Sequence, residues 1–336
     1  MNRITSCALI AILLGCSQVR QSPDESTKDS LAVAPITLVI HGGAGTIPRG
    51  SLSPEKEQAY HDMMKAALDS GYAKLETGKP AVEAVLAAIQ VLENSPLFNA
   101  GKGAVFTSEG TNELDASIME GRTLSAGAVA GVKTIRNPIL AAHAVMTKSP
   151  HVMLAGEGAE HFAAEQGLEI VPNTYFFDSA RYKQFRRSIQ KEDVKDSKHG
   201  TVGCVALDKF GDIAAGTSTG GMTNKKFGRI GDAPIIGAGT YANNATCGIS
   251  STGWGEFFIR LAVAHDISAL IEYQGLDLNT AAEKVVVEKL GALGGTGGVI
   301  GLTRDGQVTM TFNTDGMYRG YKRHGEPAKT FIYKDE

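Results

Sequence analysis

Cysteine is scarce in the body of this chain. Only four occur among 336 residues, and Cys7 and Cys16 lie so near the start that Cys204 and Cys247 alone remain for a folded core. Two cysteines cannot build the disulfide framework that holds small secreted domains together. We expect both to be buried thiols, because a free cysteine packs as a small hydrophobic residue.

The chain also lacks a long apolar run and an excess of charge of one sign. No uninterrupted apolar stretch reaches the roughly 18 residues of a membrane span, so no transmembrane helix is predicted. Lys plus Arg total 33 and Asp plus Glu total 36, which gives a net charge of −3. This balance offers no general attraction to nucleic acid or to an anionic membrane surface. Nucleic acid is therefore not an expected partner.

Metal-binding signatures are missing as well. The chain has no HExxH pair and no CxxC pair, and its eight histidines are scattered, which argues against a transition-metal site. What the chain does have is apolar material, 43% of its residues, and 40 glycines gathered in short runs. The apolar content suffices for one large core or two small ones, and the glycine runs indicate tight backbone turns.

The first 15 residues have the features of a signal peptide. Arg3 supplies a positive start, and residues 8–14 form a short apolar core before Gly15 and Cys16. The ending Leu-Leu-Gly-Cys resembles the lipobox of bacterial lipoproteins, which implies cleavage after Gly15 and a lipid on Cys16. Ser17, in place of Asp, implies the outer membrane, with the protein facing the periplasm. The alternative is an ordinary cleaved signal in which Cys16 has no special role.

Residues 16–35 have the composition of a polar tether, with almost nothing to bury. Residues 36–336 then form a single predicted domain. Any attachment to a membrane would come only through the lipid anchor.

The domain is predicted to contain helices and strands in both halves. An apolar strand at 36–40 ends in turn glycines, and Ser53 and Pro80 begin two helices, of which the first runs to Thr77. Further helices are predicted at 138–147, 157–166, 256–272 and 280–290, the last with Thr280 and Glu283 as a capping box, and further strands at 201–207, 212–215, 299–303 and 308–312.

This pattern predicts a layered α/β body in which neither half has a complete core. Between the halves, residues 181–199 mix basic and acidic side chains without apolar periodicity. We interpret this stretch as an exposed, flexible connector and not as a nucleic-acid patch, since its acids cancel its bases.

Two glycine-rich segments imitate known motifs. Gly294–Gly298 looks like a nucleotide loop but precedes a predicted strand, which indicates a tight turn. Gly216–Gly220 fits the GxSxG nucleophile elbow, with Ser218 as nucleophile and His41–Gly43 as its oxyanion segment. An elbow needs a helix directly after the serine, and the glycines that follow disfavour one. This argues against a lipase or esterase.

Thr201 is the alternative nucleophile. In an intact chain it is an ordinary strand former. If the bond from Gly200 is cut, Thr201 gains a free α-amine, whose reference pKa of about 7.7 to 8.0 leaves it partly unprotonated at neutral pH. One residue then supplies both the nucleophile and the base.

Seven motifs around this residue are similar to those of one family, the plant-type asparaginases and isoaspartyl peptidases, which are N-terminal nucleophile hydrolases. The similarity runs from about residue 36 to the end of the chain. It implies a four-layer αββα sandwich and self-cleavage between Gly200 and Thr201 into fragments 36–200 and 201–336. The motifs are HGGAG at 41–45, PLFNAG at 96–101, HGTV at 199–202, GTSTGGMTN at 216–224, GRIGD at 228–232, GAGTYANN at 237–244 and TGWGE at 252–256.

The resemblance also implies roles for individual residues. Thr219 would hold the Thr201 hydroxyl, while Thr252 and the Gly253 backbone N–H would donate to the oxyanion. The alternative for Thr219 is a simple turn hydroxyl. Asn99 occupies a family position next to the nucleophile, where a turn-forming Asn is the alternative.

In the same way, Arg229 would bind the α-carboxylate of a substrate and Asp232 its α-ammonium, with Gly255 allowing close approach. A surface ion pair between Arg229 and Asp232 is the alternative. No cofactor is required. A family loop that binds sodium through main-chain carbonyls corresponds to Leu92, Glu93, Ser95, Phe98, Ala100 and Lys102.

The expected activity is release of L-aspartate from β-aspartyl dipeptides and L-asparagine by a homodimer of cleaved protomers. Trp254 departs from the small or hydroxylated residue usual at its position, which leaves the substrate preference open. Two alternatives remain: a glycosylasparaginase, which typically has Asp where this chain has Gly200, and a lipoprotein that only binds amino acids.

Overall fold

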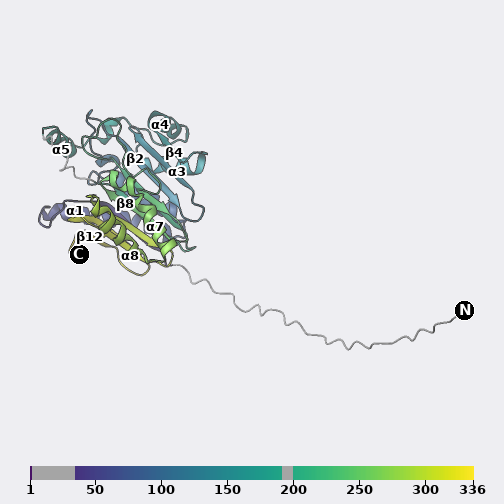
Figure 1. Cartoon of the computed structure of the whole chain (residues 1–336). Helices are drawn as coiled ribbons and strands as arrows, with labels where there is room; N and C mark the ends of the chain where they lie inside the picture. Colours follow the sequence, from purple (N-terminus) through teal and green to yellow (C-terminus); the bar gives the residue numbers. More distant parts are fainter. Residues whose placement is uncertain (2–34, 191–199) are drawn as a thin grey trace. The chain divides into compact units, whose positions relative to one another are not determined.

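Two largely antiparallel sheets lie face to face at the centre of the protein (Figure 1). The computed structural model describes residues 1, 35–190 and 200–336, so nearly all of the predicted signal peptide and tether lie outside the described residues. The larger sheet has the order β12-β11-β1-β5-β6-β2-β3-β4 and the smaller one the order β10-β9-β8-β7. The strands are β1 (Thr37–Gly45), β2 (Leu114–Glu120), β3 (Ala126–Val132), β4 (Met153–Ala155), β5 (Val202–Leu207), β6 (Ile213–Thr219), β7 (Thr240–Ala242), β8 (Cys247–Gly253), β9 (Gly297–Thr303), β10 (Val308–Phe312), β11 (Gly316–Arg323) and β12 (Lys329–Tyr333).

Helices cover the outer face of each sheet. On the larger sheet, α1 (Pro54–Glu76) packs on β1 and β11, α2 (Ala81–Glu93) on β5 and β6, and α3 (Pro138–Lys148) on β2 and β3, with α4 (Gly156–Glu165) beside β3. On the smaller sheet lie α6 (Gly255–Leu261), α7 (Val263–Gln274), α8 (Leu278–Ala282) and a π-helix, Glu283–Leu290. The order helix, sheet, sheet, helix confirms the expected four-layer sandwich.

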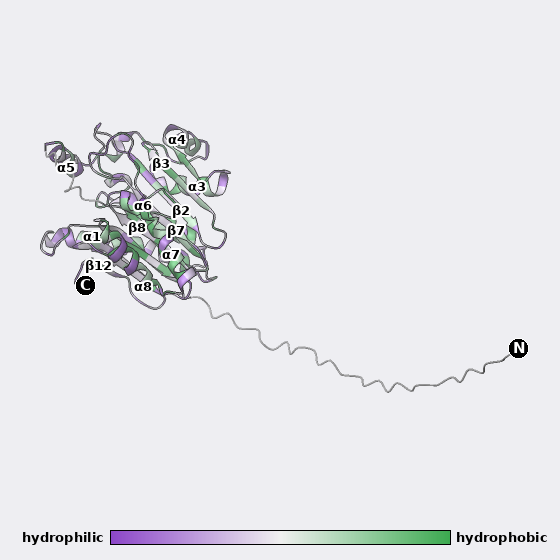
Figure 2. Ribbon diagram, in the orientation of Figure 1, coloured by the Kyte–Doolittle hydropathy of each residue, from purple (hydrophilic) through white to green (hydrophobic). Residues whose placement is uncertain are grey.

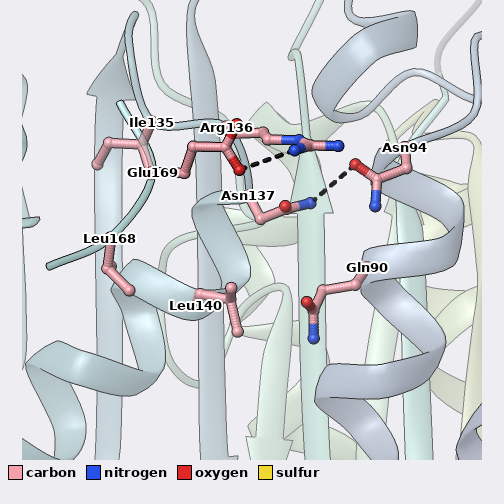
Figure 3. Close-up of a pocket in the computed structure, with 8 residues that line it drawn as sticks. All are labelled: Gln90, Asn94, Ile135, Arg136, Asn137, Leu140, Leu168 and Glu169. Atoms are coloured by element: carbon pink, nitrogen blue, oxygen red, sulfur yellow. Dashed lines mark hydrogen bonds and ion pairs between the residues drawn. The ribbon is translucent and has the colours of Figure 1, made fainter. Parts of the chain in front are cut away.

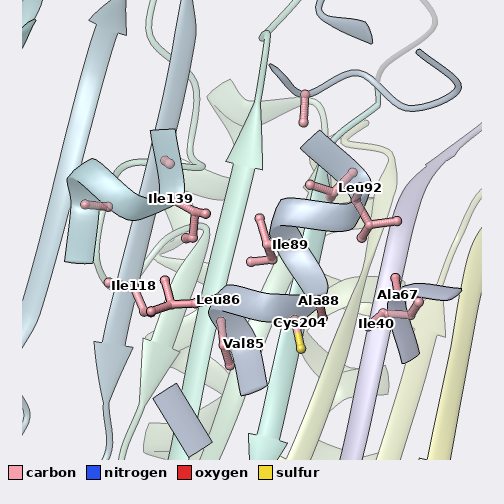
Figure 4. Packing of buried hydrophobic residues seen from close by; sticks show 14 of the residues in the cluster. Ile40, Ala67, Val85, Leu86, Ala88, Ile89, Leu92, Ile118, Ile139 and Cys204 are labelled. Carbon is pink, nitrogen blue, oxygen red and sulfur yellow. The ribbon is translucent and has the colours of Figure 1, made fainter. Parts of the chain in front are cut away.

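Each pair of neighbouring layers encloses its own apolar core. The largest lies between α1–α3 and the eight-stranded sheet, where Val85 and Ile89 of α2 pack beside Cys204 of β5 (Figure 4). A second lies under α6–α8, and a third fills the space between the two sheets. In Figure 2 the strands between the helical layers are largely hydrophobic, while polar residues gather on outer helices such as α1. Cys204 and Cys247 are both buried and free, as expected.

Several local predictions are confirmed. Ser53 caps α1 by accepting a hydrogen bond from the Lys56 N–H at 3.3 Å, and Gly78, with φ of +76°, follows its end. Pro80 precedes α2, and α3 and α4 begin within a residue of the predicted starts. None of the described helices combines the length and apolarity needed to cross a bilayer.

The predicted connector is wrong over its first half. Helix α5 spans Ser179–Gln190, and its Phe185 is buried against Phe106, with 5.9 Å between stacked ring centroids. Tyr182 and Phe185 are three residues apart and so share a face of the helix, a sparse aromatic pattern that the charged neighbours obscured. Residues 191–199 lie outside the described residues.

Other boundaries needed tertiary information. The helix predicted at 256–272 is two helices, because Ala262 adopts φ of +48° between α6 and α7. The capping box at Thr280 was wrong: Asp277 caps α8 instead, accepting from the N–H groups of Asn279 and Thr280. Both β1 and β6 extend beyond their predicted ends through glycine-containing segments. Pairing with neighbouring strands outweighs the low strand propensity of glycine: the extension of β6 pairs with β2 and β5, and that of β1 beyond His41 pairs with β11.

Candidate active site

Neighbouring strand ends bring the predicted threonines together. β5 and β6 are antiparallel with Val202 opposite Ser218, so the residue before β5 and the last residue of β6 lie side by side. These are Thr201 and Thr219, whose hydroxyl oxygens are 3.1 Å apart. Both side chains are buried, with Thr201 7% exposed. The antiparallel register therefore explains how residues 18 positions apart in the chain meet.

The Gly200 carbonyl receives several donors. The Asn99 side-chain N–H donates to it at 2.8 Å, the Thr219 hydroxyl at 3.1 Å, and the Thr201 hydroxyl lies 2.7 Å from the same oxygen. Asn99 is fixed in turn, since its Oδ1 accepts from the Val105 N–H at 3.0 Å. This arrangement polarises one peptide bond and places a hydroxyl beside it.

Only glycine fits at position 200. A Cβ there would lie 2.9 Å from the Cβ of Asn99. On the other side, Gly43 adopts φ of +114° and its own Cβ would come within 3.0 Å of the Gly200 Cα. Both approaches exclude a side chain, so Gly43 and Gly200 allow the strands to close around the Gly200–Thr201 peptide.

A pocket opens beside this peptide. It contains six of the predicted site residues, with two glycines that the sequence did not single out. The lining residues are Gly200, Thr201, Thr219, Gly221, Arg229, Gly231, Asp232 and Gly253. The predicted site is therefore one place in the fold.

Arg229 and Asp232 lie in this pocket but do not form the ion pair considered from the sequence. The Nε and Nη2 of Arg229 donate to the two carboxylate oxygens of Glu256 at 2.9 and 2.8 Å. Burial alone lowers the pKa of Arg229, but the Glu256 carboxylate outweighs it and raises the pKa overall. Glu256 is the last residue of the TGWGE motif, so the motif could have pointed to it, but its pairing with Arg229 was not predicted from the sequence.

The Asp232 carboxylate is poised to accept hydrogen bonds. It is 6% exposed, and its Oδ2 has no hydrogen-bond partner among the described residues. Burial raises the pKa of Asp232 to about 7, although its own backbone N–H and Arg229 oppose the shift. An ammonium group placed here would supply the missing donors and favour the ionised form.

The remaining predicted residues border the pocket. Thr252 is fully buried and accepts from the Ala44 N–H at 3.4 Å, one residue before the lining Gly253. A Cβ on Gly255 would lie 2.8 Å from Asp232 Oδ1 and 2.9 Å from Arg229 Nη2. Gly255 therefore lets the backbone approach both charged groups, while its predicted approach to a substrate ammonium stays a prediction.

The loop predicted to bind sodium packs tightly on itself. Gly101 adopts φ of +50°, and a Cβ there would come within 2.3 Å of the Glu93 carbonyl oxygen. A Cβ on Gly103 would lie 2.0 Å from the Phe98 carbonyl oxygen. Main-chain carbonyl oxygens of Glu93 and Phe98 thus lie directly against these two glycines. Carbonyls are suitable ligands for a hard cation, so the donor type present in the loop fits such a site. The described residues hold no cluster of three His, Cys, Asp or Glu side chains suited to a metal ion.

The Glu93 side chain has a separate position in the core. It accepts from the Ser218 hydroxyl at 2.7 Å, the Asn137 side chain at 2.9 Å and the Ile139 N–H at 3.1 Å. Burial raises its pKa to about 7 despite these bonds. Ser218 is fully buried in β6, so it is not at the exposed turn that a nucleophile elbow requires.

A second cavity lies elsewhere, between α2, α3 and residues 168–169 (Figure 3). Two of its lining residues, Arg136 and Glu169, form an ion pair at 2.7 Å. None of the predicted catalytic or substrate-binding residues lines this cavity. It is therefore separate from the site at Thr201.

The two sheets enclosed by helical layers, with this threonine-lined pocket at their strand ends, define an N-terminal nucleophile hydrolase fold. A family model described as asparaginase matches residues 34–332. The chain is 50% identical to the isoaspartyl peptidases of Salmonella typhimurium, over 308 residues, and of Escherichia coli, over 310 residues. These matches cover 89% of this chain and 98% and 96% of the relatives.

An archaeal protein is similar as well. The plant-type L-asparaginase of Pyrococcus horikoshii is 40% identical over 304 residues, which cover 86% of this chain and 97% of the relative. The chain therefore belongs to the asparaginase family, as its sequence motifs implied, and it is an enzyme of the hydrolase class.

Proposed function

We propose that this protein cuts its own chain before Thr201 and then hydrolyses β-aspartyl dipeptides and L-asparagine. The observation that carries the proposal is the Gly200 carbonyl, which accepts from Asn99 at 2.8 Å with the Thr201 hydroxyl 2.7 Å away. The names of the relatives, isoaspartyl peptidase and plant-type L-asparaginase, support the substrates.

Self-cleavage starts at the Gly200–Thr201 peptide. The Thr201 Oγ attacks the Gly200 carbonyl carbon, the C–N bond breaks, and the hydroxyl proton ends on the departing Thr201 nitrogen. Asn99 and Thr219 donate to the carbonyl oxygen as it becomes negative. Water then hydrolyses the ester and releases the Gly200 carboxylate and the Thr201 hydroxyl.

The new Thr201 amine serves as the base for hydrolysis. It takes the hydroxyl proton, Oγ attacks the side-chain carbonyl of the substrate, and the leaving ammonia or amine takes the proton. Thr252 and the Gly253 N–H donate to the oxyanion. Water hydrolyses the aspartyl ester and frees L-aspartate.

The charges of the pocket support recognition of a free amino-acid head group. Arg229 binds the α-carboxylate and Asp232 binds the α-ammonium. The Asp232 Oδ2, which has no partner among the described residues, accepts a hydrogen bond from that ammonium. The reacting carbonyl is then the one on the side chain, which makes the substrate a β-aspartyl amide.

The Trp254 ring packs edge-to-face on Phe257, with 5.2 Å between the ring centroids. We assign Trp254 to the side of the pocket that receives the leaving group.

A sodium ion would be held by main-chain carbonyls of the loop from Leu92 to Lys102. The support is the type of donor that this loop offers, since the carbonyl oxygens of Glu93 and Phe98 lie against its glycines. The positive charge of the ion would stabilise the conformation of this loop, which carries Asn99. It takes no part in the chemical steps, and no other cofactor is required.

We further propose that the protein is exported and anchored to the outer membrane through a lipid on Cys16, and that cleaved protomers pair as a homodimer. The support is the Leu-Leu-Gly-Cys ending of the first 16 residues and the family resemblance. Cys16→Ser is expected to move the protein from the membrane to the soluble fraction. An unchanged membrane fraction would contradict the anchor.

N-terminal sequencing of the smaller fragment tests the central proposal. The native protein is expected to give two bands on a denaturing gel, and the sequence of the smaller fragment should begin Thr-Val-Gly-Cys. The Thr201→Ala variant should give one band and have no activity. A lipoprotein that only binds amino acids would give one band for both proteins. Comparing a β-aspartyl dipeptide with a glycosylated asparagine separates the proposed activity from that of a glycosylasparaginase.

A further inference from the structure

The nucleophile has an anchor that the proposed chemistry does not use. The ladder between β1 and β5 ends at the pair His41 and Gly203, two residues short of Thr201. Beyond that point the His41 side chain continues the contact, because its Nδ1 lies 3.0 Å from the Thr201 carbonyl oxygen. A side chain thus replaces the backbone pairing that stops before the nucleophile.

The imidazole is held from its other side by buried hydroxyls. Its Nε2 lies 2.9 Å from the Ser250 hydroxyl of β8, which lies 2.7 Å from the Thr217 hydroxyl of β6. All three side chains are fully buried. A Cβ on Gly203 would come within 2.2 Å of Nε2 and 2.0 Å of the Ser250 oxygen, so position 203 must be glycine for this chain of hydrogen bonds to form.

The positions of the hydrogens follow from the partners on the two sides of the His41 ring. A carbonyl oxygen only accepts, so the His41 Nδ1 must carry a hydrogen to bond Thr201. Complete burial lowers the pKa of His41 to about 3, so the ring is neutral and its Nε2 accepts. The Ser250 hydroxyl therefore donates to Nε2, and its oxygen can accept from the Thr217 hydroxyl, which also lies within hydrogen-bond distance of the Gly239 carbonyl and the Thr240 hydroxyl. The Thr201 carbonyl on one side of the ring and the Ser250 hydroxyl on the other fix one tautomer and one ring orientation.

Self-cleavage makes this contact more important. Thr201 becomes the first residue of its chain and loses its covalent hold on the N-terminal side, and chain ends fray unless they are tied down. We propose that His41 is a positioning residue, whose Nδ1–H holds the Thr201 carbonyl and so keeps the amine and hydroxyl of the new N-terminus aligned. This inference rests on the proposed function.

Two uncharged substitutions separate this role from simple packing. The amide nitrogen of Asn can take the place of Nδ1, whereas the longer Gln reaches the place of Nε2. His41→Asn therefore keeps the donor to Thr201 and loses the contact with Ser250, and His41→Gln does the reverse. Each variant serves as the control for the other.

The measurement is kcat and KM for a β-aspartyl dipeptide, normalised to the cleaved fraction on a gel. We expect His41→Gln to lose about 10- to 100-fold in kcat, because a misplaced nucleophile costs about that much, with KM unchanged. His41→Asn should stay within about threefold of native kcat, since its donor remains. Equal losses in the two variants, or a loss confined to KM, would overturn the proposal.

A second measurement needs no variant. Nitrogen-15 NMR of histidine-labelled, cleaved native protein should show the His41 ring neutral from pH 5 to 8 with its proton on Nδ1, the tautomer that the Thr201 carbonyl demands. A proton on Nε2 would overturn the inference even if both variants misfold. If the native protein remains uncut, the proposed function itself fails. The tautomer of His41 tests only the positioning role, so the two failures are distinguishable.

Discussion

The Thr219 hydroxyl lies 3.1 Å from the Thr201 hydroxyl and 3.1 Å from the Gly200 carbonyl oxygen. One side chain is thus within hydrogen-bond distance of both the proposed nucleophile and the carbonyl that it would attack. Its own oxygen accepts from the Gly221 N–H at 3.0 Å, which fixes its orientation. Thr219 is therefore placed to act in both reactions of the proposed function, self-cleavage and hydrolysis.

Thr219→Val should slow self-cleavage by about 10²- to 10³-fold, the usual loss for one donor to a developing oxyanion. Valine keeps the shape of threonine and removes only the hydroxyl. The rate at which the intact band disappears from a denaturing gel measures the effect. Thr219→Ser, which keeps the hydroxyl, is the control. Equally slow cleavage in both variants would argue against a role for the Thr219 hydroxyl in self-cleavage.

Arg229→Lys should raise KM for β-aspartyl dipeptides by about 10- to 100-fold, since hydrogen bonds to charged groups contribute roughly 1.5 to 3 kcal/mol each. Lysine keeps the charge but lacks the planar fork that binds a carboxylate with two bonds. Self-cleavage should proceed normally, because it needs no α-carboxylate. Steady-state kinetics on the cleaved enzyme give KM, with the exposed Arg260→Lys as the matched control. An unchanged KM would remove Arg229 from the substrate site.

Substrate binding should weaken as the pH falls below neutrality. The pKa of Asp232 is raised to about 7 by burial, so its carboxyl is protonated below that pH and loses its attraction for the substrate ammonium. We expect KM to rise by about tenfold per pH unit below the pKa. The Thr201 amine also titrates, but it acts on kcat. Asp232→Asn should raise KM at every pH and abolish its pH dependence; a persisting dependence would point to another group.

Glu93 should make the folded state less stable as the pH rises. Its pKa is raised from 4.5 to about 7 by burial, so the folded state holds a proton that the unfolded chain releases near pH 4.5. The stability contribution is complete below that pH and is lost as the pH rises to about 7, a change of ~3 kcal/mol. Denaturant unfolding at pH 4.5 and 7.5 measures it.

Glu93→Gln is the matching variant for that measurement. The amide cannot ionise, so the difference in unfolding free energy between the two pH values should shrink by most of that amount. Glu157→Gln, on the exposed first turn of α4, is the surface control and should leave the difference unchanged. If Glu93→Gln behaves like that control, Glu93 ionises normally in the core.

Local signals in the sequence were strong where short-range chemistry decides the structure. Ser53 with Pro54 set the start of α1, and the glycine after Thr77 set its end. Signals failed where distant contacts outweighed local preference. The charged helix α5 forms because Phe185 can stack on Phe106, and no local pattern around residue 185 indicates that partner.

The same division holds for the active site. The chemistry of a threonine with a free α-amine singled out Thr201, and the resemblance of the sequence motifs to one family pointed to Thr219, Arg229 and Asp232. Which partner each side chain meets depended on strand register and layer packing. Only the folded chain pairs Arg229 with Glu256 and brings His41 to the Thr201 carbonyl, because hydrogen bonds act over about 3 Å and such distances are fixed by tertiary structure.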